Sequence, residues 1–201
     1  ATGAHWRHDG LGRANTKAIP GSDGAQVITP DDIIAGATPA GPVVVFDDDH
    51  YYMGGVIAEE LRSRGLEVTL VTPATEASSW THNTLEQERI QTRLLEMEIK
   101  IVTCQNLVEI HAGHIDLACV YTGRQTSLPA VSVVLVTMRL PDDTLYRALS
   151  EAGNVTRIGD ALAPATIAHA VYAGHRYARQ LDEPENDGVS FKRELSQLGE
   201  F

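Results

Sequence analysis

The spacing of apolar residues changes several times along the chain. A continuous apolar run, VVVF at 43–46, is followed by a segment with helical spacing, GGVIAEELRSRG at 54–65. The same order returns in LEVTLVTP at 66–73, NTLEQERIQTRLLEME at 83–98 and IKIVT at 99–103. Buried strands that alternate with amphipathic helices predict a parallel sheet covered by helices and joined by right-handed crossovers.

The ends and faces of the two helices can also be predicted. Gly65 is a suitable residue just after the end of the first helix, and Asn83 or Thr84 is a suitable N-cap for the second. In the second helix we expect one apolar side to pack in the core, formed by Leu85, Ile90, Leu94, Leu95 and Met97.

Segments outside this region have other patterns. Residues 1–42 are rich in turn residues, so we expect a connector outside the core, with a short extended segment at Gln26–Thr29. NLVEIHAGHIDLACVY at 106–121 alternates around Ala112–Gly113, which predicts a hairpin. A second unit follows: strands AVSVVLVTM (130–138) and NVTRIG (154–159), helices DDTLYRALS (142–150) and ATIAHAVYAGHRYARQL (165–181), then a polar tail.

Composition narrows the class of protein. The 201 residues include 16 Lys and Arg against 27 Asp and Glu, a formal net charge of −11 that disfavours nucleic acid and anionic membranes as partners. The two cysteines, Cys104 and Cys119, match no redox or metal-binding spacing. No apolar run approaches the roughly 18 residues of a membrane span, and no signal peptide is recognisable. We therefore expect a cytoplasmic protein.

The stretch VVVFDDDHYYMGG at 43–55 has the outline of a dinucleotide-binding turn. Asp47, Asp48 and Asp49 stand where a diphosphate would lie, and carboxylates repel phosphate. The next strand ends in Thr72 and Pro73 instead of an acidic residue for the ribose. These features disfavour a nicotinamide dinucleotide. A role for the aspartates in helix capping and surface charge is favoured over a metal site that includes His50.

No catalytic residue is predicted. Ser78 or Ser79, His82 and Asp116 could be combined into a triad, but no G-x-S-x-G motif supports it. His111 and His114 flank the hairpin turn, where exposed polar residues are favoured over a metal pair. Trp80 is interpreted as a packed lid over the sheet edge instead of a binding platform. A polar side of the last helix, solvated or in contact with another domain, comprises His169, Tyr172, His175, Arg176 and Arg179.

Several segments resemble the trimethylamine/dimethylamine/histamine dehydrogenase group of flavin oxidoreductases. They are ATG at the start, DDDHYYMGG, SSWTHNTLEQERIQTRLLE, CVYTGR, VVLVTMR and RIGDALAPATIAHAVYAGHRYARQL. The likeness covers nearly the whole chain. It implies an α/β fold with a parallel Rossmann-like sheet of the disulfide-reductase NAD-binding-domain type, together with part of a second FAD/ADP-type nucleotide domain.

The resemblance also implies a division of the chain. Residues 1–40 would be a connector from the first half of the ADP-type domain, 41–128 the small Rossmann-like domain, 129–185 the returning half, and 186–201 a polar tail. Thr2 and Gly3 would lie beside ADP, and Gly159 and Asp160 would approach its phosphate end. From the residues alone, IGDA at 158–161 is a strand-to-turn in which Asp160 caps the next helix.

The parent protein implied by the resemblance carries FMN and a [4Fe–4S] cluster in an N-terminal barrel and passes electrons to an electron-transfer flavoprotein. The start, ATGAHWRHDGLG, lacks Met and a preceding strand, so we expect a segment of a longer, homo-oligomeric amine dehydrogenase that is inactive by itself. Residues 129–185 would then leave an apolar sheet edge and face uncovered, so the chain should associate or use its N-terminal connector as cover. The alternatives are a separate nucleotide- or protein-binding module and the tail of an NAD(P)H-dependent enzyme of the dienoyl-CoA reductase type.

Overall fold

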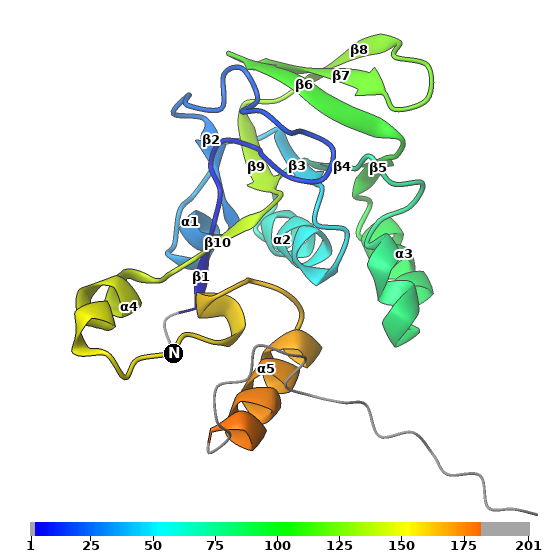
Figure 1. Ribbon diagram of the computed structural model, residues 1–201. Coiled ribbons are helices and arrows are strands. Elements are labelled where there is room, and N and C mark those ends of the chain that lie inside the picture. Colours follow the sequence, from blue (N-terminus) through cyan, green and yellow to red (C-terminus); the bar gives the residue numbers. More distant parts are fainter. Residues whose placement is uncertain (1–2, 182–201) are drawn as a thin grey trace, which may run out of the picture. The chain divides into compact units, whose positions relative to one another are not determined.

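A five-stranded parallel sheet forms the centre of the larger part of the chain (Figure 1), as the alternating pattern predicts. The computed structural model describes residues 3–181. The strand order is β2-β9-β3-β4-β5, and every neighbouring pair is parallel. The strands are β2 (Val27–Ile28), β3 (Val43–Asp47), β4 (Val68–Val71), β5 (Lys100–Val102) and β9 (Ser132–Val136). All residues of β3 and β9 are buried, as expected for central strands covered on both faces.

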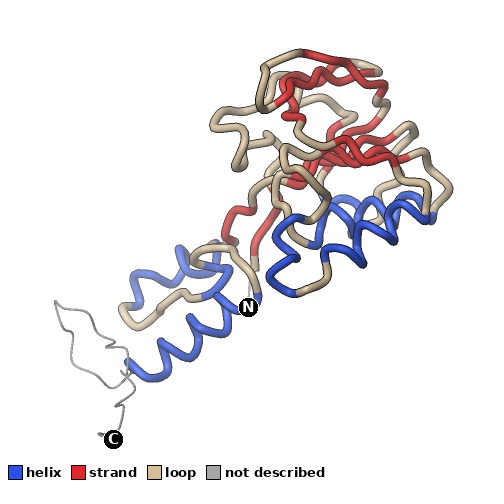
Figure 2. The backbone as a smooth tube through the Cα atoms, turned by 90° about the vertical axis from the view of Figure 1, so that its right-hand side faces the viewer, coloured by secondary structure: helices blue, strands red, loops and turns tan. Residues whose placement is uncertain are grey.

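Two different layers cover this sheet (Figure 2). Helices α1 (Pro30–Ile34), α2 (Tyr52–Ser63) and α3 (Gln87–Glu96) share one apolar cluster with one face of the parallel sheet. The antiparallel sheet of β6 (Gln105–His111), β7 (His114–Cys119) and β8 (Gln125–Pro129) shares a second cluster with the other face. The β6–β7 hairpin confirms the turn predicted at Ala112–Gly113.

The segment before Val43 contributes to the core, so its assignment as a connector outside the core is wrong. Strand β2 is an edge of the sheet, and Trp6, Ile19, Val27 and Ile33 are buried. Helix α1 follows Thr29, whose N–H and hydroxyl both donate to the Asp32 carboxylate at 2.7 and 2.8 Å. A two-residue strand and a five-residue helix are too short to show a period, which is why the pattern failed there.

Helix α3 begins later than its sequence indicates. Asn83 and Thr84 lie in a 3₁₀ helix, η1 (Ser79–Thr84), and Leu85 then takes a φ of 60° that interrupts the helical path. The predicted cap is therefore wrong. The predicted core side is only partly right, because Leu94 is buried whereas Leu85 is 94% and Leu95 57% exposed.

The chain divides into two compact units, His5–Leu140 and a smaller one made of residues 1–4 and 141–201. The smaller unit contains helices α4 (Thr144–Leu149) and α5 (Ile167–Gln180) and the 3₁₀ helices η2 (Ser150–Ala152) and η3 (Gly159–Ala161). At the residues where the units join, β1 (Ala4–Trp6) and β10 (Arg139–Pro141) form a two-stranded ribbon.

Two assignments after residue 128 differ from the structure. Strand β9 pairs in parallel with β3 of the larger unit, whereas the predicted division places it with segment 129–185. The strand predicted at 154–159 is absent, because nothing among the described residues pairs with it and a strand needs a partner for its backbone groups. The tail 186–201 lies outside the described residues.

No helix within residues 3–181 combines the length and the apolar character that crossing a bilayer demands.

Candidate functional site

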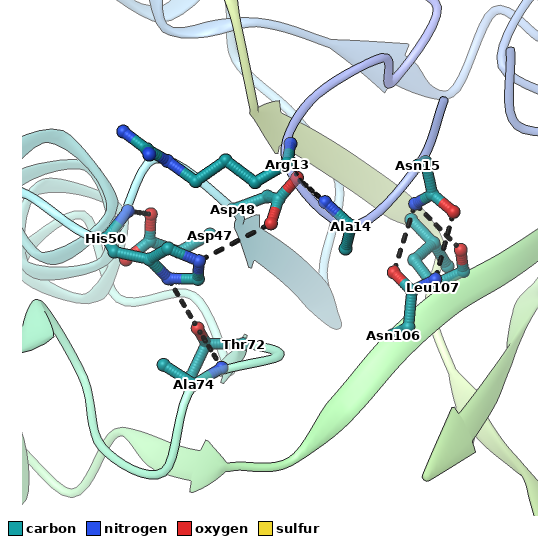
Figure 3. A network of polar contacts seen from close by, with 10 residues as sticks. All are labelled: Arg13, Ala14, Asn15, Asp47, Asp48, His50, Thr72, Ala74, Asn106 and Leu107. Carbon is teal, nitrogen blue, oxygen red and sulfur yellow. Dashed lines mark hydrogen bonds and ion pairs between the residues drawn. The ribbon is translucent and has the colours of Figure 1, made fainter. Parts of the chain in front are cut away.

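The carboxyl ends of β3, β4 and β9 meet at one edge of the parallel sheet, where doubly wound folds bind their ligands. Strand β3 runs into Asp47 and Asp48, and β4 is followed by Thr72. Figure 3 shows these residues close to the loop at 13–15. This edge is the place at which the sequence indicates an altered dinucleotide turn.

The fully buried carboxylate of Asp48 binds the chain's own backbone. Its Oδ2 accepts the N–H groups of Arg13 at 2.6 Å and Ala14 at 2.8 Å. Gly12 comes so close that an added Cβ would lie 2.2 Å from the same oxygen. Loop 12–15 therefore occupies the space in front of β3, and the two donated N–H groups neutralise part of the charge that burial disfavours.

Side chains hold this loop at both ends. Asn15 exchanges side-chain hydrogen bonds with Asn106 at 3.0 and 2.9 Å (Figure 3). The Arg13 guanidinium lies 4.2 Å from the centre of the Trp80 ring, a cation–π contact. Trp80 also donates its backbone N–H to the carbonyl of His50 at 2.9 Å. These contacts place Trp80 against the loop, but its side chain is 44% exposed, so the predicted packed lid is only partly right.

Asp47 is fully buried, and only one of its two carboxyl oxygens has a hydrogen-bond partner. Its Oδ1 accepts the His50 N–H at 3.0 Å, and its Oδ2 has no hydrogen-bond partner. Burial raises the pKa of Asp47 to about 7. Gly54 packs against it, since an added Cβ would lie 2.4 Å from the Asp47 carboxyl carbon. A glycine at position 54 therefore lets α2 approach the Asp47 carboxyl group closely.

The predicted role of the aspartates needs correction. Asp47 and Asp48 are buried, so neither adds charge to the surface. They accept N–H groups of His50, Arg13 and Ala14, none of which belongs to α2. His50 lies between them and the next strand, with Nε2 3.4 Å from Asp48 Oδ1 and Nδ1 3.3 Å from the Thr72 hydroxyl. Asp47, Asp48 and loop 12–15 therefore fill this edge of the parallel sheet, and no space remains there for a diphosphate.

The smaller unit has a separate pocket of about 540 Å³. Three of the four residues assigned to ADP by resemblance line it, namely Gly3, Gly159 and Asp160. The fourth, Thr2, lies outside the described residues. Gly159 adopts a φ of 60°, a conformation that suits glycine. Asp160 accepts the N–H of Ala165 at 3.2 Å. Because α5 begins at Ile167 and its N-cap is Thr166, the predicted capping of this helix by Asp160 is wrong.

The lining of this pocket is mostly apolar. Leu145, Leu149, Val155 and Ile158 contribute alkyl groups. Arg157, the cation among the lining residues, is paired with Asp143 and lies 4.8 Å from the centre of the Tyr146 ring. Such a pocket suits a planar ring better than a diphosphate, because its cation already has a carboxylate partner.

The remaining sequence candidates separate in space. His82 is paired with Glu76 at 2.6 Å, and Asp116 binds His111 at 3.1 Å and Ser127 at 2.5 Å, so the possible triad is not assembled. Sequence reasoning missed Arg13 and Gly12 as the occupants of the sheet edge. The two glycines of DGLG at 9–12 were the available signal, since glycine permits a close backbone approach.

Comparison with known proteins shows which family this chain belongs to. Residues 28–129 match the model of a protein family described as the OYE-like second alpha/beta domain. The chain belongs to this family. The matched residues of the OYE-like second α/β domain include the turn with the three aspartates and the antiparallel sheet.

Relatives extend the likeness beyond the matched domain. A solved histamine dehydrogenase from Rhizobium sp. 4-9 is 44% identical over 98% of the chain, with a TM-score of 0.89. The 6-hydroxypseudooxynicotine amine oxidase from Pseudomonas geniculata N1 is 40% identical over 88%, with a TM-score of 0.83. Dimethylamine dehydrogenase from Hyphomicrobium sp. (strain x) is 29% identical over 99%. The chain spans 32%, 27% and 31% of these proteins, respectively. The resemblance to the amine dehydrogenase group is confirmed.

Proposed function

We propose that the chain is the nucleotide-domain portion of a flavin-dependent amine dehydrogenase. The observation that carries this proposal is the similarity to three proteins that are named as amine dehydrogenases or an amine oxidase. The histamine dehydrogenase among them is 44% identical over 98% of the chain. The substrate class is a small amine. The chain spans less than a third of each relative, so substrate binding would fall to the rest of the protein.

The chemistry divides between this chain and the remainder. FMN would take two electrons from the amine, and a [4Fe–4S] cluster would pass them one at a time to an electron-transfer flavoprotein. A [4Fe–4S] cluster needs four cysteines, and this chain has two, both without a partner set at the required spacing. We therefore assign the chain a structural role, and we assign the redox groups to an N-terminal barrel.

A partial ADP site completes the proposal. Gly3, Gly159 and Asp160 line one pocket, as the assignment requires. The apolar lining would take the adenine ring, while Gly159 and Asp160 would approach the diphosphate end. The blocked edge of the parallel sheet argues against the alternative of an NAD(P)H-dependent enzyme, because Asp48 and loop 12–15 stand where that cofactor would bind.

The activity can be tested on the protein that contains this chain, purified from its source. We expect it to reduce an artificial one-electron acceptor when dimethylamine or histamine is added, and to show no NADH-dependent reduction. Reduction that depends on NADH and ignores every amine tested would contradict the proposed function.

The ADP site can be tested on the chain itself by calorimetric titration with ADP. Ala170 lines the pocket, whereas Ala168 is an exposed residue of the same helix. The change Ala170→Phe should fill the pocket and weaken ADP binding at least about tenfold, roughly the loss of one good contact. Ala168→Phe is the matched control and should bind as the unchanged chain does. Equal affinities in all three proteins would remove the ADP assignment without touching the amine dehydrogenase proposal.

A further inference from the structure

The antiparallel sheet presents one apolar and one polar face. Leu107, Ile110, Ile115 and Leu117 are buried in the cluster beneath it. The register shifts at an irregularity between Leu107 and Glu109, which puts Ile110 on the same face as Leu107. On the other face the strand register pairs Glu109 with Asp116, His111 with His114 and Asp116 with Ser127. Two histidines and two carboxylates therefore gather on the polar face, across the hairpin turn.

The distances within this group are short. The His111 and His114 rings stack with centroids 4.5 Å apart and planes 16° from parallel. His111 Nε2 lies 3.1 Å from Asp116 Oδ2. One ligand atom from each of His111, His114 and Asp116 lies within 4.8 Å of the others, the one such group of three among residues 3–181.

We propose that His111, His114 and Asp116 bind a divalent cation of the zinc class. Two imidazole nitrogens and one carboxylate oxygen are ligands that Zn²⁺ accepts at about 2.0–2.2 Å, with water completing a tetrahedron. Tetrahedral ligand atoms lie about 3.3–3.5 Å apart, so the separations of up to 4.8 Å would close by side-chain rotation alone. Such rotation is open to these side chains, because none of the three is buried.

Neighbouring groups are arranged as such a site requires. Asp116 Oδ1 accepts the Ser127 hydroxyl at 2.5 Å, which orients the carboxylate and leaves Oδ2 toward the histidine. Glu109 Oε1 lies 3.9 Å from His111 Nδ1, on the opposite side of the ring from Asp116. Once Nε2 of His111 binds the metal, the Glu109 carboxylate can accept the proton on Nδ1 of the same ring. This arrangement is common around zinc-bound histidines.

The test is a calorimetric titration of the full chain with ZnCl₂ at pH 7.5, paired with thermal unfolding with and without the metal. We expect one Zn²⁺ per chain and a higher unfolding temperature. His111→Gln, His114→Gln and Asp116→Asn should each weaken binding at least about tenfold. His82→Gln is the matched control, because His82 is also an exposed histidine paired with a carboxylate, and it should bind as the unchanged chain does.

A second variant excludes the competing thiol ligands. Cys104 and Cys119 are both free, so Cys104→Ser/Cys119→Ser should keep the full affinity if the histidines hold the metal. Zinc binding that disappears in this variant would overturn the proposal. So would an unchanged unfolding temperature with ZnCl₂, or equal losses in His111→Gln and His82→Gln, since the group would then be a metal-free ion pair.

Discussion

The carboxyl groups of Asp47 and Asp48 follow one another in sequence but have different surroundings. Asp48 Oδ2 receives two backbone N–H groups, whereas Asp47 Oδ2 receives none. Asp47 faces His50, Asp48 and Asp49, and burial dominates to raise its pKa to about 7. An unfolded aspartate ionises near pH 4, so between about pH 4 and 7 the folded chain binds more protons than the unfolded one. Stability therefore falls as the pH rises through this window.

Asp47→Asn should remove this dependence. The amide keeps an oxygen for the His50 N–H and cannot ionise, so the ionisation cost, on the order of 4 kcal/mol above pH 7, disappears. Urea unfolding at pH 5 and pH 8 measures this cost. Between these two pH values the free energy of unfolding should drop in the unchanged chain and stay level in Asp47→Asn. Asp23→Asn, at an exposed position, makes the same charge change and should follow the unchanged chain. Parallel profiles for all three would contradict the assignment.

At the scale of the element, helix α3 shows how a small shift in start changes the buried face. Its buried positions are Gln87 and Leu94, with Ile90 half-buried between them. Gln87 is accommodated because its amide donates to the Ala77 carbonyl at 3.1 Å and to Gln91 Oε1 at 2.9 Å. A buried glutamine whose amide donors are paired costs less than an unpaired one, so Gln87 can be buried while Leu85 is exposed.

Leu94 and Leu95 offer a direct test of this face. Leu94 is fully buried and Leu95 is 57% exposed, although both carry the same side chain. Leu94→Ala should lower the free energy of unfolding by about 2–5 kcal/mol, whereas Leu95→Ala should change it by about 0.5 kcal/mol or less. Chemical denaturation of the two variants compares them. Similar losses at both positions would show that α3 packs with the face predicted from its sequence.

At the scale of the whole molecule, apolar surface is unevenly distributed. Helix α5 has no buried residue. Ile167 is 83%, Val171 65% and Leu181 63% exposed. Exposed apolar side chains concentrated on one helix are uncommon on soluble domains.

This surface should bind an apolar fluorescent dye. We expect the chain to enhance the emission of anilinonaphthalene sulfonate, and Ile167→Glu/Val171→Glu to reduce that enhancement severalfold, because two charges interrupt the apolar side of α5. Leu85→Glu is the control, since Leu85 is exposed but lies in the larger unit. Dye emission that is unchanged in the double variant, or lost equally in the control, would show that α5 is not the apolar surface concerned.

Much of the larger unit could be predicted from local patterns. The apolar runs at 43–46 and 130–138, the glycine at 65 and the alternation around Ala112–Gly113 each act within a few residues, so the sequence alone indicated strands, a helix end and a hairpin. The resemblance to amine dehydrogenases also came from contiguous segments. The strand expected at 154–159 failed because a strand depends on a partner that its own residues do not reveal.

The sequence by itself determined the alternation of strands and helices, the acidic character of the sheet edge and the family. Only the tertiary structure decided what occupies that edge. Asp48 meets Arg13, a residue 35 positions away, and the two histidines of the hairpin meet Asp116 through strand register. Burial and partner choice depend on contacts between distant segments, and these set the pKa of Asp47, the position of loop 12–15 and the polar face proposed to bind zinc.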